Sequence, residues 1–77
     1  MSLDKDDIDN RIKYHRPNPD GIEKIALMRK FALDWSYAIH GIVPDGREQS
    51  IAYTKIEEAL MWAIAGIARE PDHWADD

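Results

Sequence analysis

The chain has 77 residues, no cysteine and a formal net charge of -5. A core of this size supplies only about 3 to 5 kcal/mol, so a single domain (residues 1–77) needs a further stabiliser, and without cysteine neither a disulfide nor a thiolate metal site can provide it. The acidic balance argues against DNA or RNA as a partner and no uncharged stretch is long enough to cross a membrane, so we expect a cytoplasmic homo-oligomer.

Residues 3–13 predict a short, weak helix at the N-terminal end. Ser2 or Asp4 is suited to cap it, and Ile8 and Ile12 fall one turn apart. Residues 14–20 contain two prolines separated by one residue, which favour an extended or turning backbone. We therefore expect a proline-rich strap that runs over the surface.

The first long helix is expected over residues 21–41. Asp20 with Glu23 three residues later fits a capping box, and Gly41 can take the left-handed conformation that ends many helices. One broad face is expected to form the core of a hairpin: Ile25, Met28, Phe31, Ala32, Trp35, Ala38 and Ile39. The opposite face mixes apolar and polar side chains and predicts a second contact surface: Ile22, Arg29, Leu33, Ser36, Tyr37 and His40.

The second long helix is expected over residues 45–69, opened by Pro44 or Asp45, with an acidic tail at residues 70–77. Two helices joined by so few residues must lie antiparallel, so the fold class is all-α, an αα-hairpin. The second helix carries an apolar arc wide enough to face both the first helix and a neighbouring chain: Ala52, Tyr53, Ile56, Ala59, Leu60, Ala63, Ile64 and Ile67.

A second stripe on this helix points to ligand binding. It recurs at helical spacing and consists of Arg47, Ser50, Thr54, Glu58, Met61, Ala65 and Arg69, with Lys55 and Trp62 on its margin. Guanidinium groups suit phosphate oxygens, hydroxyls suit sugar or base edges, and aromatic faces suit stacking. The stripe therefore predicts a site for a flat ligand that carries phosphate.

Each of these residues also has a simpler explanation. Arg69 complements the dipole at a helix C-terminus, and Arg47 beside Glu48 can be a solvated surface charge. The hydroxyls of Ser50 and Thr54 can bond to carbonyl groups of their own helix, Lys55 can pair with Glu58, and Trp35, Met61 and Trp62 suit packing. Tyr14 can either clamp the strap or stack on a ligand.

Catalysis is not expected from this sequence. Glu57 and Glu58 are adjacent on a helix, so they point in different directions and cannot act together as acid and base within one chain. A second carboxylate cluster, a serine elbow and a glycine-rich phosphate loop are absent from the sequence. The three histidines lack ligand spacing, so we expect neither a metal nor a cofactor.

Several strings of the sequence resemble a known family. They are Arg11-Ile-Lys-Tyr-His15, the prolines that follow it, a long helix, and then Val43-Pro-Asp-Gly-Arg-Glu-Gln-Ser50 and Ala52-Tyr-Thr-Lys-Ile-Glu-Glu-Ala-Leu-Met-Trp-Ala63. Together they are similar to the phage-encoded cyclic-oligonucleotide sponges that block the CBASS antiviral system and share a helical-hairpin domain with phage anti-Thoeris sponges. The resemblance spans residues 11–69.

The resemblance implies a homohexamer that binds cyclic di- and trinucleotide messengers in the host cytoplasm without cleaving them. In such proteins a tyrosine of the N-terminal segment stacks on a base, and Tyr14 matches it. A basic residue of the first long helix holds phosphate, which is either Arg29 or Lys30, with Arg29 favoured because it lies off the core face. A separate pocket where protomers converge takes trinucleotides; Thr54 and Arg69 match it better than Arg47 and Lys55.

Two other functions stay open beside sequestration. An adaptor would bind a host protein through exposed Leu33, Tyr37 and Trp62, and a nucleotide hydrolase would release linear or monomeric products. An acidic helical oligomer suits both a sponge and an adaptor, so composition alone does not separate them.

Overall fold

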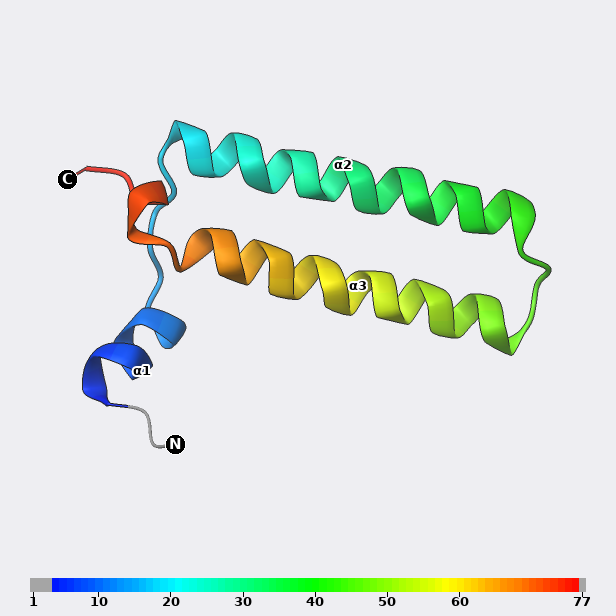
Figure 1. Ribbon diagram of the computed structural model, residues 1–77, viewed down its shortest axis with the longest axis horizontal. Helices are drawn as coiled ribbons and strands as arrows, with labels where there is room; N and C mark the ends of the chain where they lie inside the picture. The colour runs from blue at the N-terminus through cyan, green and yellow to red at the C-terminus, as the bar shows by residue number, and fades with distance from the viewer. Residues whose placement is uncertain (1–3, 77) are drawn as a thin grey trace.

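The structure is a helical hairpin with short additions at both ends, seen in a computed structural model that describes residues 4–76 (Figure 1). The elements are α1 (Lys5–Ile12), α2 (Pro19–Ile42), α3 (Arg47–Ala68) and a short 3-10 helix, η1 (Pro71–His73). The two long helices run antiparallel and pack side by side, and the described residues form no strand. The expectation of an all-α hairpin is confirmed.

The first turn of α1 is capped by Asp4, whose side chain accepts a hydrogen bond of 2.8 Å from the backbone N–H of Asp7. Ser2, the other candidate, lies outside the described residues. At the other end the N–H of Lys13 still donates to the carbonyl of Asp9, after which the chain becomes extended. Within the described residues the backbone of α1 packs closely on none of the other helices.

The first long helix begins two residues earlier than expected. Its N-cap is Asn18 and not Asp20, because the Asn18 side chain accepts from the N–H of Gly21 at 2.8 Å. Pro19 then occupies the first helical position, where its missing N–H is not needed. Asp20 lies inside the first turn and forms an ion pair of 3.0 Å with Lys24.

The loop between the long helices also differs from expectation. Gly41 stays helical, and α2 ends at Ile42. Its C-cap is Val43, which takes an extended conformation, so no left-handed glycine ends this helix. Gly46 has a φ of 156°, which favours glycine, and α3 starts after it at Arg47, two residues later than expected. Gln49 is buried and donates from Nε2 to the carbonyl of Val43 at 3.0 Å, so it ties the loop to the first turn of α3.

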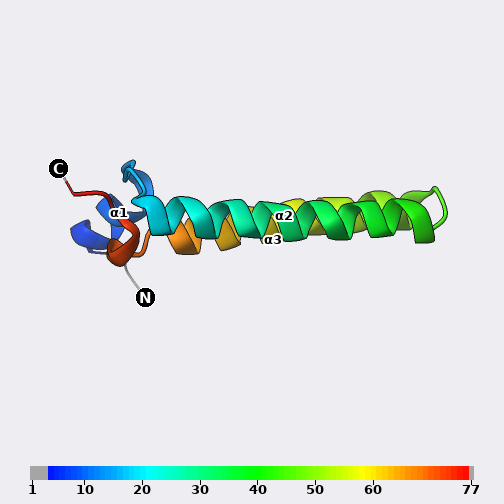
Figure 2. The same cartoon turned by 90° about the horizontal axis from the view of Figure 1, so that it is seen from above.

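A single layer of two helices leaves the hairpin without a closed core. The molecule measures 47 × 32 × 15 Å, and the edge-on view shows this thin shape (Figure 2). None of the described hydrophobic side chains is buried, and Phe31 and Trp35, expected in the core, are 53% and 66% exposed. One seam between two helices covers only one side of each apolar face.

Residues 70–76 are more than the expected acidic tail, and we name them the C-terminal clasp. They turn back through η1 and lie beside residues 16–18, with Pro17 and Trp74 forming an antiparallel bridge (Figure 1). Asp77 lies outside the described residues. The clasp joins the C-terminal residues to the segment between α1 and α2 at the open end of the hairpin.

Candidate ligand-binding site

A pocket of about 330 Å³ lies at the end of the hairpin where the clasp sits, and we name it the end pocket. It lies between the C-terminal end of α1, the extended segment after it and the facing ends of α2 and α3. Its lining residues are Asn10, Arg11, Lys13, Tyr14, His15, Pro17, Ile25, Ile64, Ala68 and Arg69. Residues more than 50 positions apart in the sequence thus contribute to one concave surface.

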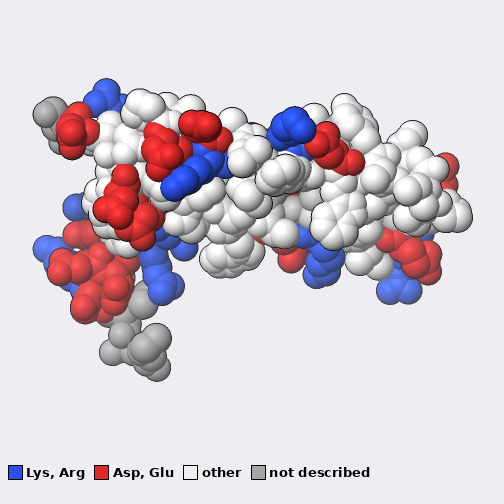
Figure 3. Space-filling view, turned by 45° about the horizontal axis from the view of Figure 1, so that its top comes forward, with Lys and Arg blue, Asp and Glu red and all other residues white. Residues whose placement is uncertain are grey.

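The end pocket is edged by cations in an acidic protein. Arg11, Lys13 and Arg69 all line it, whereas the surrounding surface of α1 is rich in carboxylates (Figure 3). Lys13 forms an ion pair with Asp9, with 3.5 Å between Nζ and Oδ2. Both side chains are exposed, and a surface pair of this kind is weak. The three cations can therefore turn toward an anionic ligand.

Aromatic side chains stand at the rim of the end pocket. Tyr14 is 83% exposed, so packing within one protomer does not account for its position. Its neighbour His15 is stacked on Trp74 with ring centroids 3.9 Å apart and planes 15° from parallel. His15 also donates from Nε2 to the carbonyl of Asn10 at 3.1 Å, since a carbonyl can only accept. Base-stacking ligands suit such a rim.

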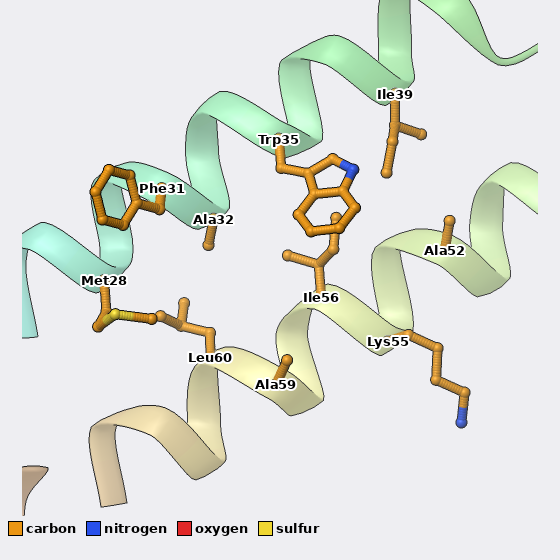
Figure 4. A pocket seen from close by; sticks show the side chains of 10 residues that line it. All are labelled: Met28, Phe31, Ala32, Trp35, Ile39, Ala52, Lys55, Ile56, Ala59 and Leu60. Carbon is orange, nitrogen blue, oxygen red and sulfur yellow. The ribbon is translucent and has the colours of Figure 1, made fainter. Parts of the chain in front are cut away.

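A second pocket of about 510 Å³ runs along the hairpin, and we name it the seam pocket (Figure 4). It is lined by Met28, Phe31, Ala32, Trp35, Ile39, Ala52, Lys55, Ile56, Ala59 and Leu60. Trp35 and Ile56 face each other across its floor, whereas the Lys55 side chain extends away from its apolar centre. Lys55 pairs with Glu58 at 3.7 Å instead. This surface suits apolar packing better than phosphate binding.

The structure brings together only part of the residue set expected from the sequence. Tyr14 and Arg69 line the end pocket and Lys55 lines the seam pocket. The remaining candidates line neither: Arg29, Lys30, Arg47, Ser50 and Thr54.

The local contacts of these remaining candidates are mostly within their own helices. Lys30 pairs with Asp34 at 3.1 Å, and the hydroxyl of Thr54 donates to the carbonyl of Ser50 at 3.2 Å. Within residues 4–76, Arg29 forms no ion pair.

The expected stripe on α3 does not form one site within a protomer. Arg47 begins α3 and Arg69 follows its last residue, so they stand roughly 30 Å apart at 1.5 Å per residue. No small ligand reaches both in one copy of the chain. Arg69 instead lines the same pocket as Tyr14, although the resemblance assigns these two residues to different pockets.

Sequence reasoning missed most of the end pocket. Arg11, Lys13 and His15 stand in the same short string as Tyr14, yet only Tyr14 was singled out. Trp74 of the clasp carried no prediction either, although a tryptophan in a polar tail is itself a signal of packing.

The described residues provide neither a metal site nor a membrane-spanning helix. Residues 4–76 contain no group of three or more histidine or acidic side chains placed to hold a metal ion. None of the described helices is long and apolar enough to span a bilayer.

The hairpin and the end pocket define a small helical binding domain whose pocket combines cations with an exposed aromatic ring. The model of the Acb2/Tad1 hairpin domain matches residues 4–68, and the chain therefore belongs to this family of anti-CBASS and anti-Thoeris sponges. The resemblance seen in the sequence is confirmed. The family sponges cyclic nucleotide signals and is not a family of enzymes. Neither the curated proteins nor the solved structures contain a significant match.

Proposed function

We propose that the protein binds cyclic di- and trinucleotide messengers without cleaving them and so withholds them from CBASS effectors in the host cytoplasm. The observation that carries this proposal is that Tyr14 and Arg69, from opposite ends of the chain, line one pocket together with Arg11 and Lys13. A cyclic oligonucleotide offers a flat base for the ring of Tyr14 and phosphates for the cations. Family membership supports the same ligand class.

The proposal includes assembly into a homo-oligomer, with a hexamer as the expected form. The described residues bury no hydrophobic side chain, and the seam pocket exposes Phe31 and Trp35. A second copy that covers this surface would supply the apolar burial that one hairpin lacks.

A second pocket for trinucleotides, formed where protomers converge, is also part of the proposal. We place Thr54 in it first, and then Arg47 and Lys55; none of these three lines the end pocket. Arg69, which the resemblance assigns to this second pocket together with Thr54, we place in the end pocket instead. Arg29 and Lys30 stay candidates for phosphate contacts made across protomers. Arg29 is favoured, because it lies off the core face expected for the first long helix.

The direct test is calorimetry against a panel of cyclic di- and trinucleotides, with the intact mass of the assembly measured in parallel. We expect Tyr14→Ala to weaken binding about 5- to 150-fold, the loss of one base stack. Tyr37→Ala is the matched control, since Tyr37 is 67% exposed and lines neither pocket. Arg47→Ala should affect trinucleotides alone.

Recovery of the ligand separates sequestration from hydrolysis. After incubation and heat denaturation, chromatography should return the cyclic nucleotide unchanged, and linear products would show catalysis.

The adaptor alternative draws on Leu33, Tyr37 and Trp62, which are all more than half exposed. A stable complex with a host protein, combined with no heat stabilisation by any cyclic nucleotide, would favour it.

A further inference from the structure

The C-terminal clasp lies beyond the residues that the family model matches, which end at position 68. Four hydrogen bonds tie it to the extended segment. The backbone N–H of Asn18 donates to His73 at 2.7 Å and that of Ala75 donates to Arg16 at 2.8 Å. The side chains of Asn18 and Arg16 donate to the carbonyls of Asp72 and Asp76 at 2.8 and 3.2 Å.

The clasp is also attached to the end of α3. His73 donates from Nδ1 to the carbonyl of Ile67 at 2.9 Å, and Trp74 donates from Nε1 to the carbonyl of Ala68 at 2.8 Å. The last carbonyls of a helix have no partner within the helix, so Trp74 satisfies that of Ala68, whereas that of Ile67 also accepts from the backbone N–H of Glu70 at 3.3 Å. The clasp is therefore fixed to the same turn of α3 that precedes Arg69.

The segment that carries Tyr14 has few other attachments. Within residues 4–76, no hydrogen bond joins residues 14–17 to α2 or α3. Its bonds run either to α1, which packs closely on no other helix, or to the clasp. The stack of His15 on Trp74 adds an attachment directly beside Tyr14.

We propose that the C-terminal clasp positions the end pocket, with Trp74 as the positioning residue that holds Tyr14 opposite Arg69. This inference rests on the proposed function, because Tyr14 and Arg69 are its ligand contacts. Trp74 touches both sides of the gap, through its ring on His15 and through Nε1 on the last turn of α3. If Tyr14 is already held in place, less conformational entropy is lost when the ligand binds.

The test is a double-mutant cycle between Trp74→Ala and Tyr14→Ala, read by calorimetry with the cyclic dinucleotide that the wild type binds best. Since Trp74 acts through Tyr14, its loss cannot weaken binding more than loss of Tyr14 itself, about 5- to 150-fold. We expect Trp74→Ala to weaken binding within that range in the wild type and by less than about 2-fold in the Tyr14→Ala background. Equal losses in both backgrounds would overturn the proposal.

Tyr37→Ala serves again as the matched control, because Tyr37 is 67% exposed on α2 and lines neither pocket. Variants are compared at concentrations where the intact mass equals that of the wild type, and Trp74→Phe retains packing if Trp74→Ala proves unstable. Trp74→Phe keeps a ring for stacking on His15 but loses the bond to Ala68, so we expect an intermediate loss of affinity. Wild-type affinity in both Trp74 variants would contradict a positioning role.

Amide hydrogen exchange tests the anchoring without any nucleotide. In the free wild type the N–H groups of Asn18 and Ala75 are bonded across the clasp and should be protected. Trp74→Ala should speed their exchange at least about 10-fold while the middle of α2 and α3 stays protected. Unchanged exchange would overturn the inference by itself. A wild type that bound no cyclic nucleotide would refute the proposed function, whereas the exchange result would still decide whether Trp74 anchors the segment.

Discussion

Replacing Gly21 with alanine tests how tightly the clasp is seated on α2. Gly21 is buried in the first turn of the helix, and an added Cβ would lie 3.0 Å from the carbonyl oxygen and 3.1 Å from the Cβ of His73. The distance between the two Cβ atoms is shorter than the contact of about 3.5 to 4.0 Å that nonbonded carbon atoms prefer, and the distance to the carbonyl oxygen is also tighter than an ordinary van der Waals contact. The carbonyl of His73 has little freedom to retreat, because it already accepts from Asn18 at 2.7 Å.

The expected magnitude follows from two opposing effects. Overpacking costs about 1 to 3 kcal/mol, whereas alanine is favoured over glycine inside a helix by about 1 kcal/mol. With the midpoint of the overpacking range, about 2 kcal/mol, set against the gain of about 1 kcal/mol, Gly21→Ala should lower the free energy of unfolding by about 1 kcal/mol. Gly41→Ala is the matched control in the same helix, since no atom lies within 4 Å of its added Cβ, and it should raise stability by about 0.5 to 1 kcal/mol.

The measurement is thermal unfolding followed by circular dichroism at one protein concentration, because any assembly makes Tm depend on concentration. For a domain of this size each 1 kcal/mol moves Tm by about 4 to 8 °C. The two variants should therefore shift Tm in opposite directions. If Gly21→Ala raised Tm as much as Gly41→Ala does, the clasp would not be seated against α2 as described.

Three further substitutions probe the rest of the hairpin, each read by urea unfolding at fixed protein concentration. Asn18→Ala should cost about 1 to 2 kcal/mol, because it removes both the cap of α2 and a bond to the clasp; no loss would show that the cap does not form. Gln49→Ala should cost about 1 to 3 kcal/mol, since it leaves the carbonyl of Val43 without this bond, and a neutral result would contradict the burial of Gln49. Lys55→Met should change stability by less than about 0.5 kcal/mol, because its pair with Glu58 is exposed on both sides, and a larger loss would indicate a contact beyond the single chain.

The hairpin itself could be predicted because its causes are local. Two long stretches with helical periodicity flank a short connection that contains Pro44 and Gly46, and such a pattern leaves only an antiparallel pair. The helix ends are harder to predict because neighbouring residues compete to cap the same turn. Asn18 was the better N-cap than Asp20 because Pro19 after it fits the first helical position.

The end pocket could be predicted only in part because its members are distant in sequence. Tyr14 and Arg69 were both identified, each by the chemistry of its side chain, but nothing in the periodicity of a helix shows that they meet. Their meeting depends on the turn at Pro71 and on Trp74, whose partner His15 lies far away in the chain. Contacts of this kind are set by tertiary packing, which the spacing of residues within one element does not encode.

The clasp also has a consequence for the order of folding. It joins residues 54 and 60 positions apart, as in the bonds of Asn18 to Asp72 and of Arg16 to Asp76, whereas the turns of the helices form from neighbours. Closing so long a loop costs about 3 to 4 kcal/mol of chain entropy unless the hairpin has already brought its ends together. We therefore expect the two long helices to pair before the clasp closes, so that the end pocket is the last part of the chain to form and the first to be lost on unfolding.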